Sequence, residues 1–151
     1  MAEFKESLVA GQELEELVLQ HIRKDYPCSV RIPGKFPGYD IFIPEKDVKI
    51  EVKQDKKSLH TGNLVIETSM FGKPSGIMST DAHYIYFDTG EELLIICPRD
   101  IFKCIVKNNI PEVTFTGEGD TNEKTACLVK VDLLRPYCLK VQKSLIKLSL
   151  N

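Results

Sequence analysis

The chain has 151 residues, a length that suits one domain with a single sizeable hydrophobic core. With a net charge of −2, the chain lacks the overall basic character of a protein that binds nucleic acid without regard to sequence. Any basic surface that binds nucleic acid must therefore be local. No apolar run approaches the ~20 residues that cross a bilayer, and the charged N-terminal residues contain no signal-peptide core. We therefore expect a cytoplasmic protein with no membrane segment.

The cysteines are odd in number and scattered, and no two of them form a CxxC pair. This pattern predicts reduced thiols that mostly pack in the interior, and it argues against a structural zinc site. The five positions are Cys28, Cys97, Cys104, Cys127 and Cys138.

The first predicted element is a helix over residues 7–25, with Ser7 as its N-cap and Pro27 just beyond its end. Apolar side chains and one histidine recur on one face at helical spacing. They are Leu14, Leu17, Val18, His21 and Ile22. Three glutamates surround this stripe: Glu16 points away from it, whereas Glu13 and Glu15 flank it.

A short strand over residues 29–32 and a Gly/Pro-rich loop lead to the most informative stretch, residues 40–53. β-branched and aromatic residues lie on both sides of a turn over residues 44–47, which predicts a β-hairpin. In its second strand, Lys49, Glu51 and Lys53 alternate with apolar residues and share one face. The turn can bring Asp40, at the start of the first strand, back beside Glu51.

Two close carboxylates raise each other's pKa unless a cation lies between them. Carboxylate oxygens, with the remaining positions left to water and phosphate, are typical ligands of Mg²⁺. Lys53 is two residues from Glu51, on the same face of the strand, where its ammonium can hold an attacking water or offset charge on a phosphate. The alternative is an ordinary surface hairpin, because Glu-x-Lys alone is very common.

The arrangement Asp40, then Glu51-Val52-Lys53, resembles the catalytic core of the PD-(D/E)XK nuclease superfamily, in its small phage- or prokaryote-encoded members. The family pattern places an Asp before a hairpin strand and Glu/Asp-x-Lys in the next strand. One departure is that Tyr39, not proline, precedes Asp40. The predicted order of helix, strand and hairpin matches the opening order of that family.

The resemblance implies a restriction-endonuclease-like αβββαβ core, with a central mixed sheet flanked by helices. It also implies Mg²⁺ or Mn²⁺ bound by Asp40, Glu51 and the carbonyl of Val52, with Lys53 as a catalytic residue. A further metal-ligating glutamate often follows a glycine on the first helix, and Gly11-x-x-x-Glu15 selects Glu15. Glu13 stays open as an alternative.

Beyond Lys53, residues 54–63 are polar and locally basic, which predicts a loop at the edge of a nucleic-acid site. Gln54 and Lys56 are its candidate phosphate contacts. A strand over residues 64–67 precedes a second loop, Gly-Lys-Pro-Ser-Gly at residues 72–76, whose Lys73 and Ser75 are further candidates. This loop resembles one found in the same nucleases, although an ordinary connecting loop fits equally well.

The remaining pattern predicts strands over residues 83–87 and 92–97, a helix over 99–107 and a strand over 126–131. An acidic loop covers residues 116–124, and the tail over 139–150 predicts a closing strand, a helix or a dimer contact.

We thus expect one nuclease-like domain over residues 1–151 that cleaves phosphodiester bonds, with DNA as the expected partner and a homodimer possible. A resolvase of Holliday junctions, an RNA endonuclease and a non-catalytic nucleic-acid-binding module on the same fold stay open.

Overall fold

The computed structural model describes residues 2–33, 38–70, 72–116 and 123–150, with the backbone alone at residues 2–10 and 70. The helices are α1 (Ala2–Arg23), α2 (Ser58–Thr61), α3 (Pro98–Lys107), α4 (Val131–Leu134) and α5 (Leu145–Ser149), with 3₁₀ turns η1 (Gly76–Met78) and η2 (Arg135–Tyr137). The strands are β1 (Val30–Arg31), β2 (Ile41–Ile43), β3 (Val48–Gln54), β4 (Asn63–Met70), β5 (Lys73–Pro74), β6 (Tyr84–Asp88), β7 (Glu92–Ile96), β8 (Glu112–Thr116), β9 (Glu123–Lys130) and β10 (Lys140–Lys143).

The strands form two sheets. The larger sheet has six strands in the order β1-β2-β3-β6-β7-β10, and only its β3–β6 pair is parallel, so the predicted central mixed sheet is confirmed. The smaller sheet, with the order β5-β4-β9-β8, is antiparallel throughout and was not predicted. The chain leaves the larger sheet after β3, contributes β4 and β5 to the smaller one, and returns as β6.

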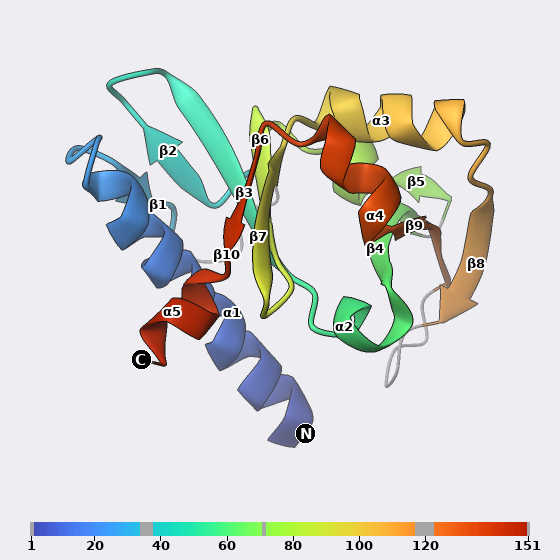
Figure 1. Ribbon diagram of the computed structural model, residues 1–151, viewed down its shortest axis with the longest axis horizontal. Coiled ribbons are helices and arrows are strands. Elements are labelled where there is room, and N and C mark those ends of the chain that lie inside the picture. The colour runs from blue at the N-terminus through green and yellow to red at the C-terminus, as the bar shows by residue number, and fades with distance from the viewer. Residues whose placement is uncertain (1, 34–37, 71, 117–122, 151) are drawn as a thin grey trace.

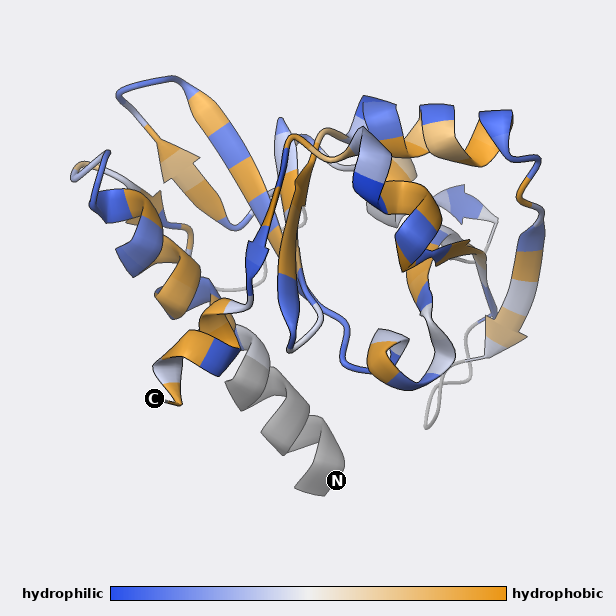
Figure 2. Ribbon diagram, in the orientation of Figure 1, coloured by the Kyte–Doolittle hydropathy of each residue, from blue (hydrophilic) through white to orange (hydrophobic). Residues whose placement is uncertain are grey.

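The larger sheet is covered on both faces (Figure 1). Helices α1 and α5 lie on one face, and α3 with the smaller sheet lies on the other. Along β6, Ile85 and Phe87 point toward the smaller sheet, and Tyr84 and Tyr86, which alternate with them, face the α1 side. The bands of Figure 2 show the same alternation of hydropathy along β3.

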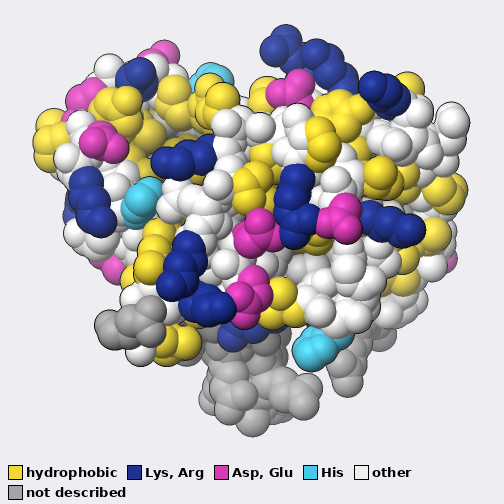
Figure 3. Space-filling view, in the orientation of Figure 1, with side chains coloured by type: hydrophobic (Ala, Val, Ile, Leu, Met, Phe, Trp, Pro, Cys, Tyr) yellow, Lys and Arg dark blue, Asp and Glu magenta, His cyan; other side chains and the backbone are white. Residues whose placement is uncertain are grey.

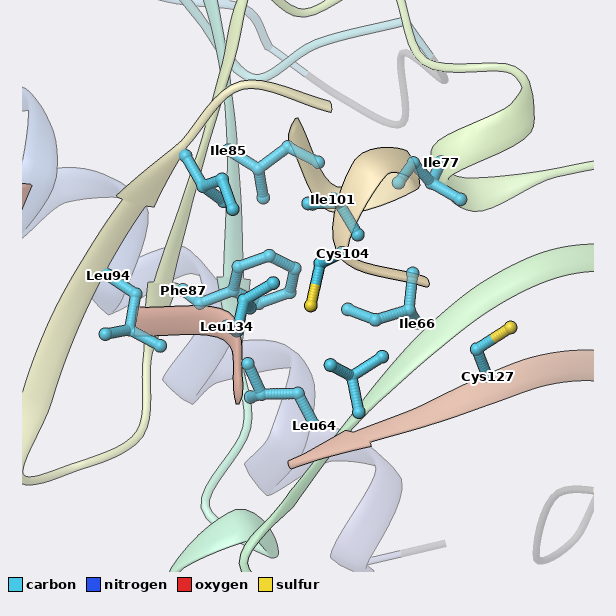
Figure 4. Packing of buried hydrophobic residues seen from close by; sticks show 12 residues of the cluster. Leu64, Ile66, Ile77, Ile85, Phe87, Leu94, Ile101, Cys104, Cys127 and Leu134 are labelled. Atoms are coloured by element: carbon cyan, nitrogen blue, oxygen red, sulfur yellow. The ribbon is translucent and has the colours of Figure 1, made fainter. Parts of the chain in front are cut away.

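One hydrophobic core fills the space between the two sheets and α3 (Figure 4). Leu64 and Ile66 of β4 and Ile101 and Cys104 of α3 are buried there, facing Phe87 of the larger sheet. Each of these side chains is less than a tenth exposed, and burying a side chain of this size contributes about 1.5–3 kcal/mol. This core fixes the position of β4 against β3, and so shapes the site described below.

The predicted elements agree with the structure in most places, including the 40–53 hairpin, in which Ile41 pairs with Ile50. The prediction of Ser7 as an N-cap is wrong, because the helix already begins at Ala2. The residues before Ser7 include Ala, Glu and Lys, which have high helix propensity and allow the helix to extend past it. The predicted loop over residues 54–63 contains the short helix α2.

Strand β8 was not predicted, and β9 begins at Glu123, earlier than expected. Most of the predicted acidic loop over residues 116–124 lies outside the described residues, as does the middle of the loop that precedes Asp40. The tail contains both a strand, β10, and a helix, α5.

All five cysteines lie in the described part of the chain, where no disulfide joins them, and Cys104 and Cys127 are buried as expected. Within the described residues, no helix has the length and apolar character needed to cross a membrane.

Candidate functional site

Asp40 is held against β3 by two hydrogen bonds. Its backbone N–H donates to the carbonyl oxygen of Ile50 at 2.8 Å, which extends the hairpin pairing by one residue. Its carboxylate oxygen Oδ2 accepts the backbone N–H of Val52 at 2.7 Å. The carboxylate therefore lies at the edge of β3, beside the residue that separates Glu51 from Lys53.

The backbone of Val52 is directed toward this carboxylate. In a β-strand, the N–H and C=O of one residue point to the same edge. The Val52 N–H points to the β2 edge, where the pairing with β2 has already ended at Ile50. The Val52 carbonyl therefore also faces the Asp40 edge of the strand, as a metal ligand at this position would require.

Glu15, of the three helix glutamates, is the one brought next to Asp40. The two carboxyl groups lie close enough for the charge of Asp40 to act on Glu15, and Arg31 Nη2 lies 3.4 Å from Glu15 Oε2. Burial raises the pKa of Glu15, the negative charge of Asp40 raises this pKa further, and Arg31 partly opposes both effects. Glu13 and Glu16 are exposed.

Glu51 is buried, and it faces the smaller sheet rather than solvent. Burial raises the pKa of its carboxyl, Lys53 lowers this pKa, and the negative charges of Asp40 and Glu67 raise it. The Lys53 Nζ lies 4.0 Å from Glu51 Oε1, and about half of the Lys53 side chain is exposed. The ammonium is thus close to the carboxylate and still accessible to a substrate.

A cavity of about 210 Å³ lies between the two sheets at this point. Glu51 and Lys53 form one wall of the cavity, and Glu67 of β4 forms the opposite wall. Glu67 Oε2 accepts a hydrogen bond of 2.9 Å from the Ser75 hydroxyl, and Lys124 Nζ lies 3.7 Å from Glu67 Oε1. Sequence reasoning missed Glu67, because no spacing in the sequence relates β4 to β3 and only the packing of the two sheets brings them together.

The other predicted phosphate contacts are less closely placed. Gln54 is half-buried at the end of β3, and Lys56 and Lys73 are exposed. Within the described residues neither lysine forms an ion pair, so both are accessible cations, Lys56 between β3 and α2 and Lys73 on the short strand β5. Ser75 is instead bonded to Glu67, which places its hydroxyl at the cavity wall.

Among the described side chains, no three His, Cys, Asp or Glu residues are grouped closely enough to hold a metal ion as they stand. Each carboxylate has another contact: Asp40 with the Val52 N–H, Glu15 with Arg31 and Glu51 with Lys53. The donors are nonetheless the hard oxygens that Mg²⁺ prefers, and the mutual repulsion of the carboxylates is what a cation would relieve. The chemistry of these donors therefore suits such an ion.

Comparison with known proteins adds nothing to this geometry: the chain matches no protein-family model, no curated protein and no solved structure. The face seen in Figure 3 carries Lys and Arg interspersed with Asp and Glu. On the described surface, Arg135 pairs with Glu92 and Asp132, and Lys147 pairs with Glu91. Charges neutralised in this way give little attraction for a polyanion.

Proposed function

We propose that the chain is a metal-dependent nuclease that hydrolyses phosphodiester bonds, with DNA as substrate, on a restriction-endonuclease-like core. The observation that carries the proposal is the bond from Val52 to Asp40, which holds one carboxylate beside Glu51 and Lys53 at the end of a hairpin. The parallel pairing of β3 with β6, after an opening helix and three antiparallel strands, also agrees with such a core.

The chain's own residues have separate roles in this proposal. Asp40, Glu51 and the Val52 carbonyl would hold Mg²⁺ or Mn²⁺, and Glu15 would complete the set directly or through water. When bound, the ion polarises a phosphoryl oxygen and lowers the pKa of water. Lys53 positions the attacking water and offsets the negative charge that develops on the phosphate. Gln54, Lys56, Lys73 and Ser75 supply contacts to the nucleic-acid backbone.

The test is cleavage of end-labelled single-stranded, double-stranded and branched DNA, and of RNA, with Mg²⁺, Mn²⁺ or EDTA. Asp40→Asn and Lys53→Met are the test variants, and Lys107→Ala, an exposed lysine on α3, is the matched control. We expect DNA cleavage that requires the metal, is lost in both test variants and is retained in the control.

Other outcomes distinguish the alternatives. Cleavage confined to branched DNA or to RNA would replace the DNA-cutting role with a resolvase or an RNA endonuclease. Binding of DNA without cleavage of any substrate would indicate a non-catalytic module. Cleavage that survives both Asp40→Asn and Lys53→Met would show that the hairpin is not the catalytic site.

A further inference from the structure

A second cavity lies on the opposite face of the larger sheet. Its volume is about 430 Å³, within the ~300–1,000 Å³ typical of small-molecule sites. Part of its lining comes from the C-terminal end of α1 and from the β2–β3 hairpin, which are neighbours in Figure 1. Ile50 lines its floor, whereas Glu51 and Lys53 line the first cavity on the other face of the same strand. The two cavities are therefore separated by the sheet.

Three tyrosines line this cavity: Tyr26 follows α1, and Tyr84 and Tyr86 lie two residues apart on β6. Elsewhere on this face of the sheet the buried side chains are aliphatic, such as Ile41 and Leu93. Tyrosines instead combine a flat apolar ring with a polar tip, which suits a wall that is apolar on one side and wet on the other.

The phenol hydroxyls are available to a ligand. Within the described residues, those of Tyr26, Tyr84 and Tyr86 take part in no hydrogen bond. Burial, and then the proximity of Tyr84 and Tyr26, raise the pKa of Tyr86 to about 12, so its hydroxyl remains a proton donor at neutral pH. The cavity therefore offers donors from several directions around apolar rings.

Positive charge gathers at the rim. Lys46 Nζ lies 5.5 Å from the centre of the Tyr26 ring, and Lys140 also lines the cavity. Burial lowers the pKa of His21, and the charges of Lys24 and Lys140 lower it further, although Asp25 opposes them. The imidazole is thus neutral at neutral pH, and among the described lining residues the cations outnumber the one carboxylate, Asp25.

We propose that this cavity binds a small molecule that combines a flat aromatic ring with an anionic group, the chemistry of a nucleoside monophosphate or an aromatic carboxylate. The ring packs against Tyr84 and Tyr86, the phenol hydroxyls donate to its polar atoms, and Lys46 and Lys140 bind the anionic group. This site does not depend on the nuclease proposal, because it lies on the other face of the sheet.

The test is isothermal titration calorimetry of the full chain with AMP and with indole-3-acetate, and with adenosine and inorganic phosphate as single-feature probes. We expect saturable binding of AMP, of indole-3-acetate or of both, at least about tenfold tighter than either single-feature probe. Tighter binding of AMP identifies a phosphate as the preferred anionic group, and tighter binding of indole-3-acetate identifies a carboxylate. Equal or absent binding of all four probes overturns the proposal.

Variants locate the binding. Lys46→Ala and Lys140→Ala are each expected to lower the affinity for the bound probe by about 5- to 20-fold, since each removes a charge-assisted contact. Tyr86→Phe removes only a hydroxyl and is expected to weaken binding by several-fold. Lys107→Ala, an exposed lysine of α3 outside the cavity, should leave the affinity unchanged, and its circular dichroism and that of the other variants should match the parent chain. Binding lost in Lys107→Ala but kept in Lys46→Ala and Lys140→Ala overturns the proposal.

Discussion

Asp40 and Val52 are joined by a hydrogen bond of 2.7 Å in which a backbone N–H of β3 donates to a side chain that precedes β2. Asp40 therefore contributes both to the hairpin and to the charge of the candidate site. Replacing it by Asn separates these contributions, because an amide oxygen still accepts the bond but carries no charge.

For Asp40→Asn we expect a folded protein whose DNA cleavage falls by at least about 10²–10³-fold, the range for loss of one preorganised electrostatic group. Asp47→Asn is the matched control. Asp47 is an exposed carboxylate in the turn of the same hairpin, with φ of 53°, a conformation that Asn tolerates. Cleavage rates and thermal unfolding of the two variants, measured side by side, check this prediction. Equal losses of activity in both variants would contradict it.

Glu51→Gln should stabilise the metal-free protein at pH 7. The folded-state pKa of Glu51 lies above its ordinary value of 4.5, chiefly because the side chain is buried. The stability contributed by the protonated carboxyl is fully present below about pH 4.5 and is lost as the pH rises through the raised folded-state pKa. The neutral amide of the Glu51→Gln variant has no such loss, so the free energy of unfolding of the variant should exceed that of the parent at pH 7 and approach it near pH 4. Urea unfolding at both pH values measures this difference and its sign.

The Glu51→Gln variant also tests whether Glu51 binds the proposed metal ion. A metal concentration of about 100 times Kd should stabilise the parent chain by about 2.7 kcal/mol, and Glu51→Gln should remove most of this gain. A parent chain that gains no stability from Mg²⁺ or Mn²⁺ would contradict the proposed ligand set.

Gly76→Ala should destabilise the fold more than Gly62→Ala. Both glycines have positive φ, 53° and 76°, which costs a residue with a Cβ about 1–2 kcal/mol. At Gly62 a Cβ would meet no atom within 4 Å, whereas at Gly76 it would overlap the carbonyl oxygen of Glu67. We therefore expect losses of about 1 kcal/mol for Gly62→Ala and about 3 kcal/mol for Gly76→Ala, measured by chemical unfolding. Similar losses at the two sites would show that the close approach to β4 is not required.

Asp88→Ala should be strongly destabilising. The carboxylate is fully buried and accepts hydrogen bonds from the Ser144 hydroxyl at 2.6 Å, from the Gly90 N–H at 2.9 Å and from the Leu145 N–H at 3.0 Å. Each orphaned donor costs about 1–3 kcal/mol, so we expect a loss of about 3–5 kcal/mol in the free energy of unfolding. Asp132→Ala removes an exposed carboxylate and should cost less than about 1 kcal/mol. A small effect at Asp88 would mean that the tail is held by other contacts.

The sequence predicted the parts of the molecule that depend on local pattern. The hairpin over residues 40–53 follows from turn chemistry and alternation, and α3 follows from Pro98 at its start and Asn108 at its end. The resemblance to the nuclease pattern, in which a glutamate follows a glycine on the first helix, selected Glu15, the glutamate that lies next to Asp40.

The sequence did not predict the smaller sheet or Glu67. The pairing of β4 with β9 joins residues from 54 positions apart, Met70 and Lys124, to 67 positions apart, Asn63 and Lys130, and no local period records such contacts. Strand β8 is almost entirely exposed, so it lacks the contrast between apolar and polar positions by which strands are recognised. The structural role of Asp88 was missed because its partner Ser144 lies far away in the sequence, in the C-terminal tail.

The path of β4 has a consequence for the order in which the molecule matures during synthesis. Glu51 and Lys53, which form one wall of the first cavity, lie in the first part of the chain to be translated. Glu67, on the opposite wall, lies on β4, which pairs with β9, and β9 is translated much later. Contacts this distant in sequence form only after the intervening segment is available. The cavity is therefore completed only when residues 123–130 have emerged from the ribosome, so a nascent chain that ends before them would carry the hairpin carboxylates without a finished pocket.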